Sequence, residues 1–159
     1  VVLGKGISGG IYPISATVYH EQFIDFFKAD PFLHISTFGG SEIGCLAAME
    51  TLRISRQPEF LAHVHQLGDF MTSRLNTLRD QMPGLGLEVR GIGLMLGLAF
   101  KDETTALFMI KLLFDKGVYV VYAGNDPRVI QFLPVLNINR GDAEAIIEMV
   151  EACCRELSK

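Results

Sequence analysis

The chain opens with Val1-Val2-Leu3-Gly4-Lys5-Gly6-Ile7-Ser8-Gly9-Gly10, an apolar run that leads into a lysine flanked by glycines. Consecutive apolar residues are typical of a buried strand, and a glycine-rich stretch after them is typical of a turn. From Ile11 to Tyr19 most residues are β-branched or aromatic, which favours an extended segment, although Pro13 limits where it can sit in a sheet. The sequence therefore predicts that Lys5 lies on a short turn at the mouth of a sheet.

The same stretch matches the dinucleotide-binding pattern G-x-G-x-x-G at Gly4, Gly6 and Gly9. That pattern works only when the third glycine lies on a helix whose N-terminus faces a pyrophosphate. Here Gly10 and Pro13 follow, so we expect no such helix, and the Gly-Lys-Ser/Thr order of a Walker motif is absent. Two interpretations of Lys5 remain: an ordinary solvated turn residue, or an amine placed for Schiff-base chemistry.

A second candidate site is the loop His34-Ile35-Ser36-Thr37-Phe38-Gly39-Gly40-Ser41. We expect a helix after it, to about Ser55, with Ser41 as its N-cap. Hydroxyls and glycine N–H groups beside a helix N-terminus suit a phosphate, which gains hydrogen bonds and a favourable dipole. Most loops of this composition only cap their helix, so this loop alone leaves both interpretations open.

The rest of the chain alternates between helical and strand patterns. A long helix is predicted from Pro58 to the Pro83-Gly84 stop, because apolar residues recur there at helical spacing. Strands are predicted over 87–90, 94–100, 118–122 and 129–133, with a turn over 124–127. Further helices are expected over 102–117, capped by Asp102 and closed by Gly117, and over 143–157. Residues 58–159 thus follow the order α-β-β-α-β-β-α and could close a core. Residues 1–55, which combine strand and loop ends with one helix, cannot close a core alone.

Composition excludes several classes of protein. The 159 residues carry a net charge of −4 and are 49% hydrophobic, which suits a folded domain and argues against disorder and against a nucleic-acid partner. We expect no membrane span, because no apolar run reaches about 18 residues. The 3 Cys form no C-x-x-C, which excludes a disulfide scaffold and favours a reducing, cytoplasmic location. Because the chain begins without Met in the middle of an apolar run, we expect it to be part of a larger protein.

No metal site is expected. His63 and His65 lie two residues apart on the predicted long helix, so they diverge and are expected to be surface residues. Cys153 and Cys154 adjoin on the last helix, where we expect idle thiols, with Cys154 packed inward. For Arg90, a contact with substrate and a structural role both stay open.

Four stretches, Val2 to Ala16, His34 to Gly40, Val89 to Gly97 and Val129 to Leu136, follow one another along the chain. Together they resemble the motifs of class III (ornithine/acetylornithine/4-aminobutyrate-type) aminotransferases. Val2 to Ala16 is similar to the segment around the family's cofactor lysine, and His34 to Gly40 to its His-Gly-Ser-Thr-Tyr/Phe-Gly-Gly loop. Val89 to Gly97 resembles its Val-Arg-Gly-x-Gly-Leu-Met-x-Gly strand pair, and Val129 to Leu136 its arginine-containing strand that ends in Pro-Pro-Leu. The resemblance covers nearly the whole chain.

The resemblance implies an α/β protein, a pyridoxal 5'-phosphate (PLP) enzyme of fold type I. Residues 1–57 would be the end of the large PLP-binding domain, and residues 58–159 the small C-terminal α+β domain. Lys5 would be the catalytic residue, forming a Schiff base with the cofactor and then moving a proton as general base and acid. Ser36 and Thr37 would hold the cofactor phosphate from the partner subunit of a homodimer.

Three departures from the family pattern matter. Ile35 stands where glycine is usual, Ser41-Glu42 replaces Asn-Pro, and Gln131 occupies the position of the arginine that grips a substrate carboxylate. Arginine pairs bidentately with a carboxylate, whereas glutamine offers only neutral hydrogen bonds. Gln131 therefore predicts a small-molecule or carrier-bound amine or carbonyl substrate that lacks an α-carboxylate or presents it differently. Arg128 is expected on the opposite face of the strand.

The leading hypothesis is transamination between an amine or amino acid and a carbonyl acceptor by a full-length dimer. A PLP-dependent decarboxylase, epimerase or aminomutase of the same fold is an alternative, as is a non-catalytic association module. The family's residues that contact the cofactor ring lie upstream of its lysine. We therefore expect these 159 residues alone to bind PLP poorly and to be inactive.

Overall fold

The structure is a computed structural model that describes residues 1–30 and 32–158. The chain divides into two compact units, Val1–Pro58 and a second unit that begins at Glu59.

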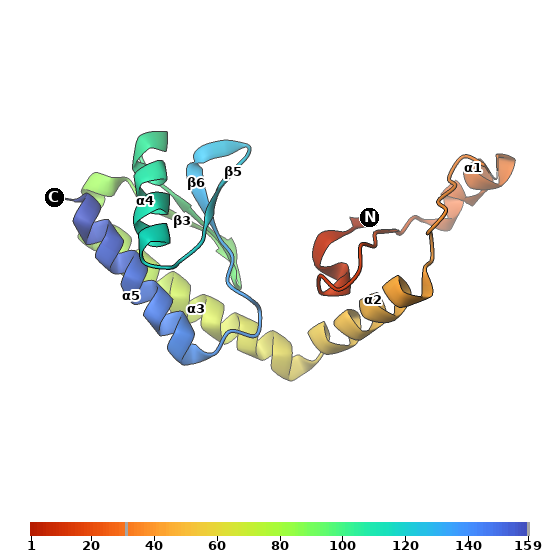
Figure 1. Cartoon of the computed structure of the whole chain (residues 1–159), viewed down its shortest axis with the longest axis horizontal. Coiled ribbons are helices and arrows are strands. Elements are labelled where there is room, and N and C mark those ends of the chain that lie inside the picture. Colours follow the sequence, from red (N-terminus) through yellow and green to blue (C-terminus); the bar gives the residue numbers. More distant parts are fainter. Residues whose placement is uncertain (31, 159) are drawn as a thin grey trace. The chain divides into compact units, whose positions relative to one another are not determined.

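The first unit contains a two-stranded ribbon, two short 3₁₀ helices and two α-helices (Figure 1). Strand β1 (Val2–Leu3) pairs antiparallel with β2 (Ala16–Thr17), so the predicted strand and extended segment are confirmed. The predicted burial of this strand is wrong, because Val2 and Leu3 are exposed on a ribbon of only two strands. Between them lies the 3₁₀ helix η1 (Lys5–Ser8). After the ribbon come η2 (Glu21–Phe23), α1 (Ile24–Ala29) and, beyond the serine- and glycine-rich loop, α2 (Glu42–Ser55).

The turn that follows β1 packs on α2 through small residues. A Cβ at Gly44 of α2 would lie 2.9 Å from the Tyr12 ring and 3.0 Å from Ile14 Cδ1. Further along the helix, the Thr51 hydroxyl lies 3.2 Å from the place of a Cβ on Gly9. Ser8 is buried, and its hydroxyl donates to the Tyr12 carbonyl. These contacts fix the turn that carries Lys5 against α2.

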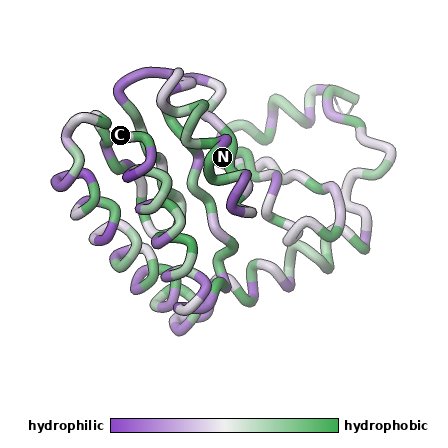
Figure 2. The backbone as a smooth tube through the Cα atoms, turned by 60° about the vertical axis from the view of Figure 1, so that its left-hand side comes forward, coloured by the Kyte–Doolittle hydropathy of each residue, from purple (hydrophilic) through white to green (hydrophobic). Residues whose placement is uncertain are grey.

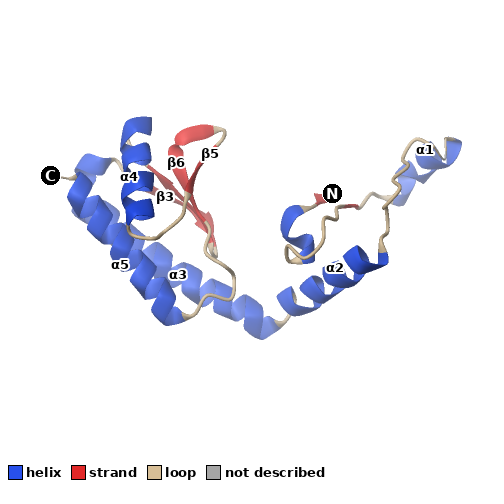
Figure 3. Cartoon of the chain, in the orientation of Figure 1, coloured by secondary structure: helices blue, strands red, loops and turns tan. Residues whose placement is uncertain are grey.

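The second unit is a four-stranded antiparallel sheet with three long helices (Figure 3). The elements in chain order are α3 (Pro58–Gln81, whose first residue belongs to the first unit), the 3₁₀ helix η3 (Pro83–Leu85), β3 (Glu88–Ile92), β4 (Met95–Ala99), α4 (Glu103–Asp115), β5 (Val121–Ala123), β6 (Asp126–Phe132) and α5 (Arg140–Leu157). The strands lie in the sheet in the order β3-β4-β6-β5. The predicted order α-β-β-α-β-β-α is confirmed.

One face of this sheet forms the core with the helices. Leu96 and Leu98 of β4 and Ile130 and Phe132 of β6 are buried in the same cluster as side chains of all three helices. The helix residues of this cluster include Met71, Leu75, Met109, Leu113, Ile147 and Val150. Figure 2 shows the corresponding alternation of hydrophobic and hydrophilic residues along the helices. The apolar residues that recur at helical spacing from Val64 to Met82 in α3 therefore belong to this core or pack against it.

Caps and strand ends differ in part from the predictions. Asp102 caps α4 as expected, because its carboxylate accepts from Thr105 N–H at 2.7 Å. Ser41 occupies the N-cap position of α2, but among the described residues its side chain accepts no hydrogen bond from that helix. The predicted turn over 124–127 is too long, because β6 begins at Asp126 and leaves Gly124 and Asn125 as the turn. The strand predicted over 118–122 begins too early, because β5 starts at Val121. Val120, just before it, is buried but is not part of the strand.

His63 is not the surface residue that the sequence predicts. It is half-buried, and its Nε2 lies 2.9 Å from the Ile138 carbonyl oxygen, in the connection between β6 and α5. The bond ties α3 to a segment 75 residues away. His65 is exposed, as expected.

Candidate functional site

Lys5 has an unusual backbone conformation. Among the described residues it is the only non-glycine residue with positive φ, at 57°. A side chain in this region costs about 1–3 kcal/mol, so it persists only where the surroundings determine it, often at functional sites. The lysine is exposed, and a Cβ placed on the neighbouring Gly6 would meet no atom within 4 Å. Lys5 thus stands on a fixed turn with open space beside it.

The Ser36-Thr37 loop is a tight turn in front of α2. Gly39 N–H donates to the Ser36 carbonyl at 3.1 Å, and a Cβ on Gly39 would lie 3.0 Å from Ser36 Cβ. Gly40 follows with φ of 70°. Both hydroxyl-bearing residues are exposed. The glycines therefore let the backbone turn tightly and leave the hydroxyls accessible to an anion.

The two candidate clusters lie near opposite ends of α2 (Figure 1). The turn after Lys5 reaches Thr51 near the C-terminal end of the helix, whereas the Ser36-Thr37 loop leads into Glu42 at its N-terminal end. Glu42 and Thr51 are nine residues apart along α2, which corresponds to about 13 Å along the helix axis. Within one chain, the structure therefore does not bring Lys5 together with Ser36 and Thr37.

Gln131 lies on the sheet face opposite the core. Its strand neighbours Ile130 and Phe132 are buried on the core side, so alternation places Gln131 on the open face. Its amide Nε2 donates to the Tyr122 carbonyl of β5 at 3.2 Å. Arg128 falls in phase with Ile130 and Phe132 along β6, but its exposed guanidinium lies near the charges of Glu88 and Arg90.

Two arginines at this sheet are each paired with an acid two residues earlier on the same strand. Arg90 donates to Glu88, and the Arg128 guanidinium donates to both carboxylate oxygens of Asp126 at 3.0 and 2.9 Å. These hydrogen bonds lower the pKa of both carboxyls, Glu88 through Arg90 and Asp126 through Arg128. We did not predict the acid partners, although the i, i+2 spacing of opposite charges in a strand could have indicated them.

The cysteines and histidines are candidates for metal ligands or reactive groups. The described residues contain no group of three or more His, Cys, Asp or Glu that could hold a metal ion. Cys153 and Cys154 are fully buried, and burial raises the pKa of both thiols, that of Cys154 to about 12. Nor does any helix within residues 1–30 and 32–158 have the length and apolar character needed to cross a membrane.

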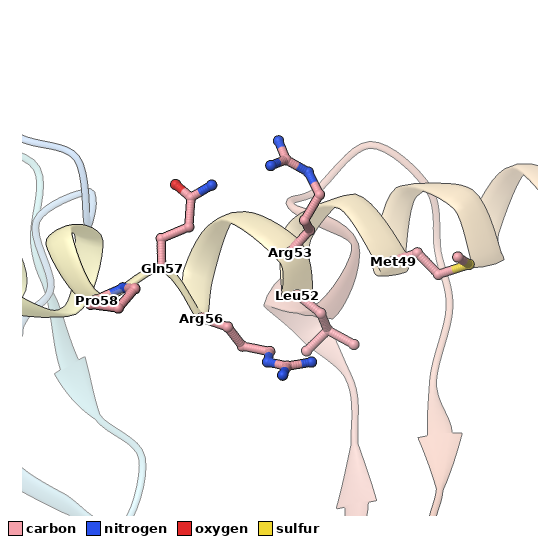
Figure 4. Close-up of a pocket in the computed structure, with 6 residues that line it drawn as sticks. All are labelled: Met49, Leu52, Arg53, Arg56, Gln57 and Pro58. Atoms are coloured by element: carbon pink, nitrogen blue, oxygen red, sulfur yellow. The ribbon is translucent and has the colours of Figure 1, made fainter.

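A shallow hollow of about 590 Å³ lies at the C-terminal end of α2. Arg53 and Gln57 point to one side of the helix there, and Arg56 to the other (Figure 4). Arg53 is also held by Glu50 at 2.6 Å. Because the polar groups do not converge, the hollow is a poor candidate for a ligand site.

The chain is similar to known aminotransferases along most of its length. The family described as "Aminotransferase class-III" matches residues 1–154. A relative from Archaeoglobus fulgidus, described as an uncharacterized aminotransferase, is 38% identical over 148 residues, which are 93% of this chain and 35% of that protein.

Two solved structures share the fold. The acetylornithine aminotransferase from Elizabethkingia anophelis is 26% identical with a TM-score of 0.83, and the alignment covers 98% of this chain and 40% of that one. The ornithine aminotransferase from Toxoplasma gondii is 24% identical with a TM-score of 0.86, covering 98% and 36%.

These similarities confirm the predicted fold, that of fold type I transferases, and the chain spans well under half the length of these relatives. Together with the match over residues 1–154, they show that the chain belongs to the class III aminotransferase family.

Proposed function

We propose that the protein to which these residues belong is a PLP-dependent transaminase, with Lys5 as its catalytic residue. It would move an amino group between an amine or amino acid and a carbonyl acceptor. The observation that carries the proposal is the exposed Lys5, fixed at φ of 57° between two glycines in a chain of the class III family.

The residues present fit the cofactor. PLP supplies, when bound, an aldehyde and an electron-withdrawing ring that stabilises negative charge on the substrate carbon. Lys5 Nζ would hold the aldehyde carbon covalently and, once released by an incoming amine, would move a proton from the substrate carbon as general base and return it as general acid. The open space beside Gly6 suits the approach of a flat ring. The Ser36 and Thr37 hydroxyls would donate to the phosphate.

The active state we propose is a homodimer that shares its sites. The separation of Lys5 from the Ser36-Thr37 loop along α2 supports an arrangement in which each subunit gives its loop to the partner's lysine. We propose that residues 1–57 belong to a large PLP-binding domain and residues 58–159 form the small domain. The three free thiols favour a cytoplasmic location.

The substrate we propose lacks an α-carboxylate, or presents it away from residue 131. Gln131 is neutral, and its amide is already bonded to the Tyr122 carbonyl. An acid group there would gain no ion pair. The test is a panel of amino donors, small or carrier-bound, on the full-length enzyme. Amines should outperform α-amino acids; a strong preference for α-amino acids that Gln131→Ala abolishes would contradict the substrate assignment.

Absorbance tests the enzyme assignment itself. The full-length protein should show a cofactor band that sodium borohydride removes, with the reduced cofactor attached to the peptide that contains Lys5. Lys5→Ala should show neither. Absence of the band in the wild-type protein would favour a non-catalytic association module. Turnover without a carbonyl acceptor would instead indicate a decarboxylase, epimerase or aminomutase.

A further inference from the structure

Ser8 is the one polar side chain that is buried among the described residues, with 1% of its surface exposed. Its hydroxyl donates to the Tyr12 carbonyl, so its burial leaves the donor paired. The burial is unusual in the first unit, where most apolar side chains are exposed. Because an unpaired polar group is costly to bury, this bond opposes any movement that would separate Ser8 from Tyr12.

The Ser8 hydroxyl closes the turn on which Lys5 stands. Lys5 is the first residue of η1, and Ser8 is the last. Beyond Ser8 the chain passes through Gly9 and Gly10, with φ of 62° and 78°, and returns to the Ser8 hydroxyl at Tyr12. Glycine has more conformational freedom than any other residue, so these two positions do not hold the turn by themselves. The Ser8 side chain supplies a bond that does.

The closed turn is also packed against α2. A Cβ at Gly9 would lie 3.2 Å from a threonine hydroxyl of the helix, and a Cβ at Gly44 would lie 2.9 Å from the Tyr12 ring. The residue after Ser8 and the acceptor of its bond are therefore both in close contact with one helix. Relaxation of Lys5 from φ of 57° would have to move this packed segment, which opposes the relaxation.

We propose that Ser8 is a positioning residue that holds Lys5 Nζ at the place where the amine reacts. This inference rests on the proposed function, in which Lys5 is catalytic. Ser8 is not placed to move a proton itself, because its hydroxyl is buried and donates to a backbone carbonyl, which only accepts. Without the bond, the φ of Lys5 would relax toward negative values and its Cα–Cβ bond would turn. A displacement of about 1 Å at a reacting group can lower a rate about a hundredfold.

The first test uses the full-length, cofactor-loaded enzyme. Ser8→Ala should lower kcat at least about tenfold and leave KM for the amino donor within about twofold, because it displaces the reacting amine rather than a substrate contact. At equal cofactor concentration, borohydride treatment should attach less reduced cofactor to the peptide that contains Lys5.

Ser158→Ala is the matched control for this test. The Ser158 hydroxyl also donates to a carbonyl four residues away, that of Cys154 at 2.9 Å, but it belongs to the second unit. Its loss removes the same kind of bond at a place remote in sequence from the lysine turn. Ser158→Ala should therefore leave both kcat and the attachment of the cofactor unchanged.

The second test needs neither cofactor nor activity. It compares the urea midpoints of Lys5→Gly and Lys5→Ala in the full-length protein, each alone and each combined with Ser8→Ala. Lys5→Gly should have the higher midpoint when Ser8 is present, and the difference should fall by at least half in the Ser8→Ala background. A serine that only adds stability would leave the difference unchanged, because the two effects would then be additive. Ser8→Cys, a weaker donor of similar size, should give a smaller change in the same direction and serves where Ser8→Ala does not fold.

An undiminished difference between the two Lys5 variants, or no difference even when Ser8 is present, would overturn the assignment of Ser8. So would a Ser8→Ala enzyme with the kcat of the wild type, or a loss no larger than that in Ser158→Ala. These outcomes leave the proposed function intact. Failure of the proposed function would appear earlier, as a wild-type protein without the borohydride-sensitive band.

Discussion

Lys5 adopts a left-handed backbone conformation that only glycine adopts without strain, with φ of 57°. At such a position alanine keeps the strain and glycine removes it. We therefore expect Lys5→Gly to be more stable to urea unfolding than Lys5→Ala by about 1 kcal/mol. In the full-length enzyme both variants should be inactive, because neither has the amine of Lys5. Equal stability of the two would show that the turn does not impose this conformation.

A second residue-scale prediction concerns pH and the cap of α4. The Asp102 carboxylate accepts the Thr105 N–H, and this bond lowers the pKa of Asp102. Because the pKa is lower in the folded state, the unfolded chain takes up the proton first as pH falls. The stabilisation is thus present at neutral pH and is lost as pH drops from about 4 through the folded pKa.

Asp102→Asn keeps a cap acceptor but does not titrate. The urea midpoint should therefore decrease less between neutral pH and about pH 3 in this variant than in the wild-type chain. An NMR titration of the Asp102 carboxyl gives the pKa directly. A value at or above that of an unfolded aspartate would contradict the cap as the cause.

At the scale of elements, the turn between β3 and β4 packs backbone-to-backbone on α3. A Cβ on Gly68 would lie 2.5 Å from the Gly93 carbonyl oxygen, which cannot move without moving the hairpin. Gly68→Ala should lower the free energy of unfolding by about 2–3 kcal/mol, although alanine favours helix. Gly84→Ala is the control, since a Cβ there meets nothing within 4 Å. Denaturant unfolding measures both; similar values would contradict the close contact.

Periodicity and caps predicted most of the elements, because α3, α4 and α5 carry clear apolar stripes and Asp102 has standard cap chemistry. Contacts distant in sequence were not predictable. The burial of His63 depends on Ile138, 75 residues away, and the place of Gln131 beside Tyr122 depends on a sheet register. Local pattern also misplaced the start of β6, because the Asp126-Pro127 pair resembles a turn. The site residues Lys5, Ser36, Thr37 and Gln131 remain predictions drawn from motif resemblance.

At the scale of the whole molecule, the two units differ sharply in how much apolar surface they bury. Of the buried apolar side chains among the described residues, only Ala48 lies in the first unit. In that unit, Val2, Ile11, Phe38 and Leu46 are 65–80% exposed. A two-stranded ribbon is at best marginally stable without further strands. The second unit, in contrast, has a continuous core across four strands and three helices.

We therefore expect the 159-residue chain to unfold in two parts. In hydrogen exchange, amides of β4 and α5 should be protected at least about a hundredfold more than those of η1 and α2, since protection follows local burial. PLP added to this chain should neither raise the protection of α2 nor give a borohydride-sensitive band. In the full-length dimer, α2 should be protected like α5, because its exposed residues Ile43, Leu46 and Met49 would be covered. Equal protection of α2 and α5 in the 159-residue chain would mean that the first unit is stable with the contacts it makes here, and the inactivity expected of this chain would then need another cause.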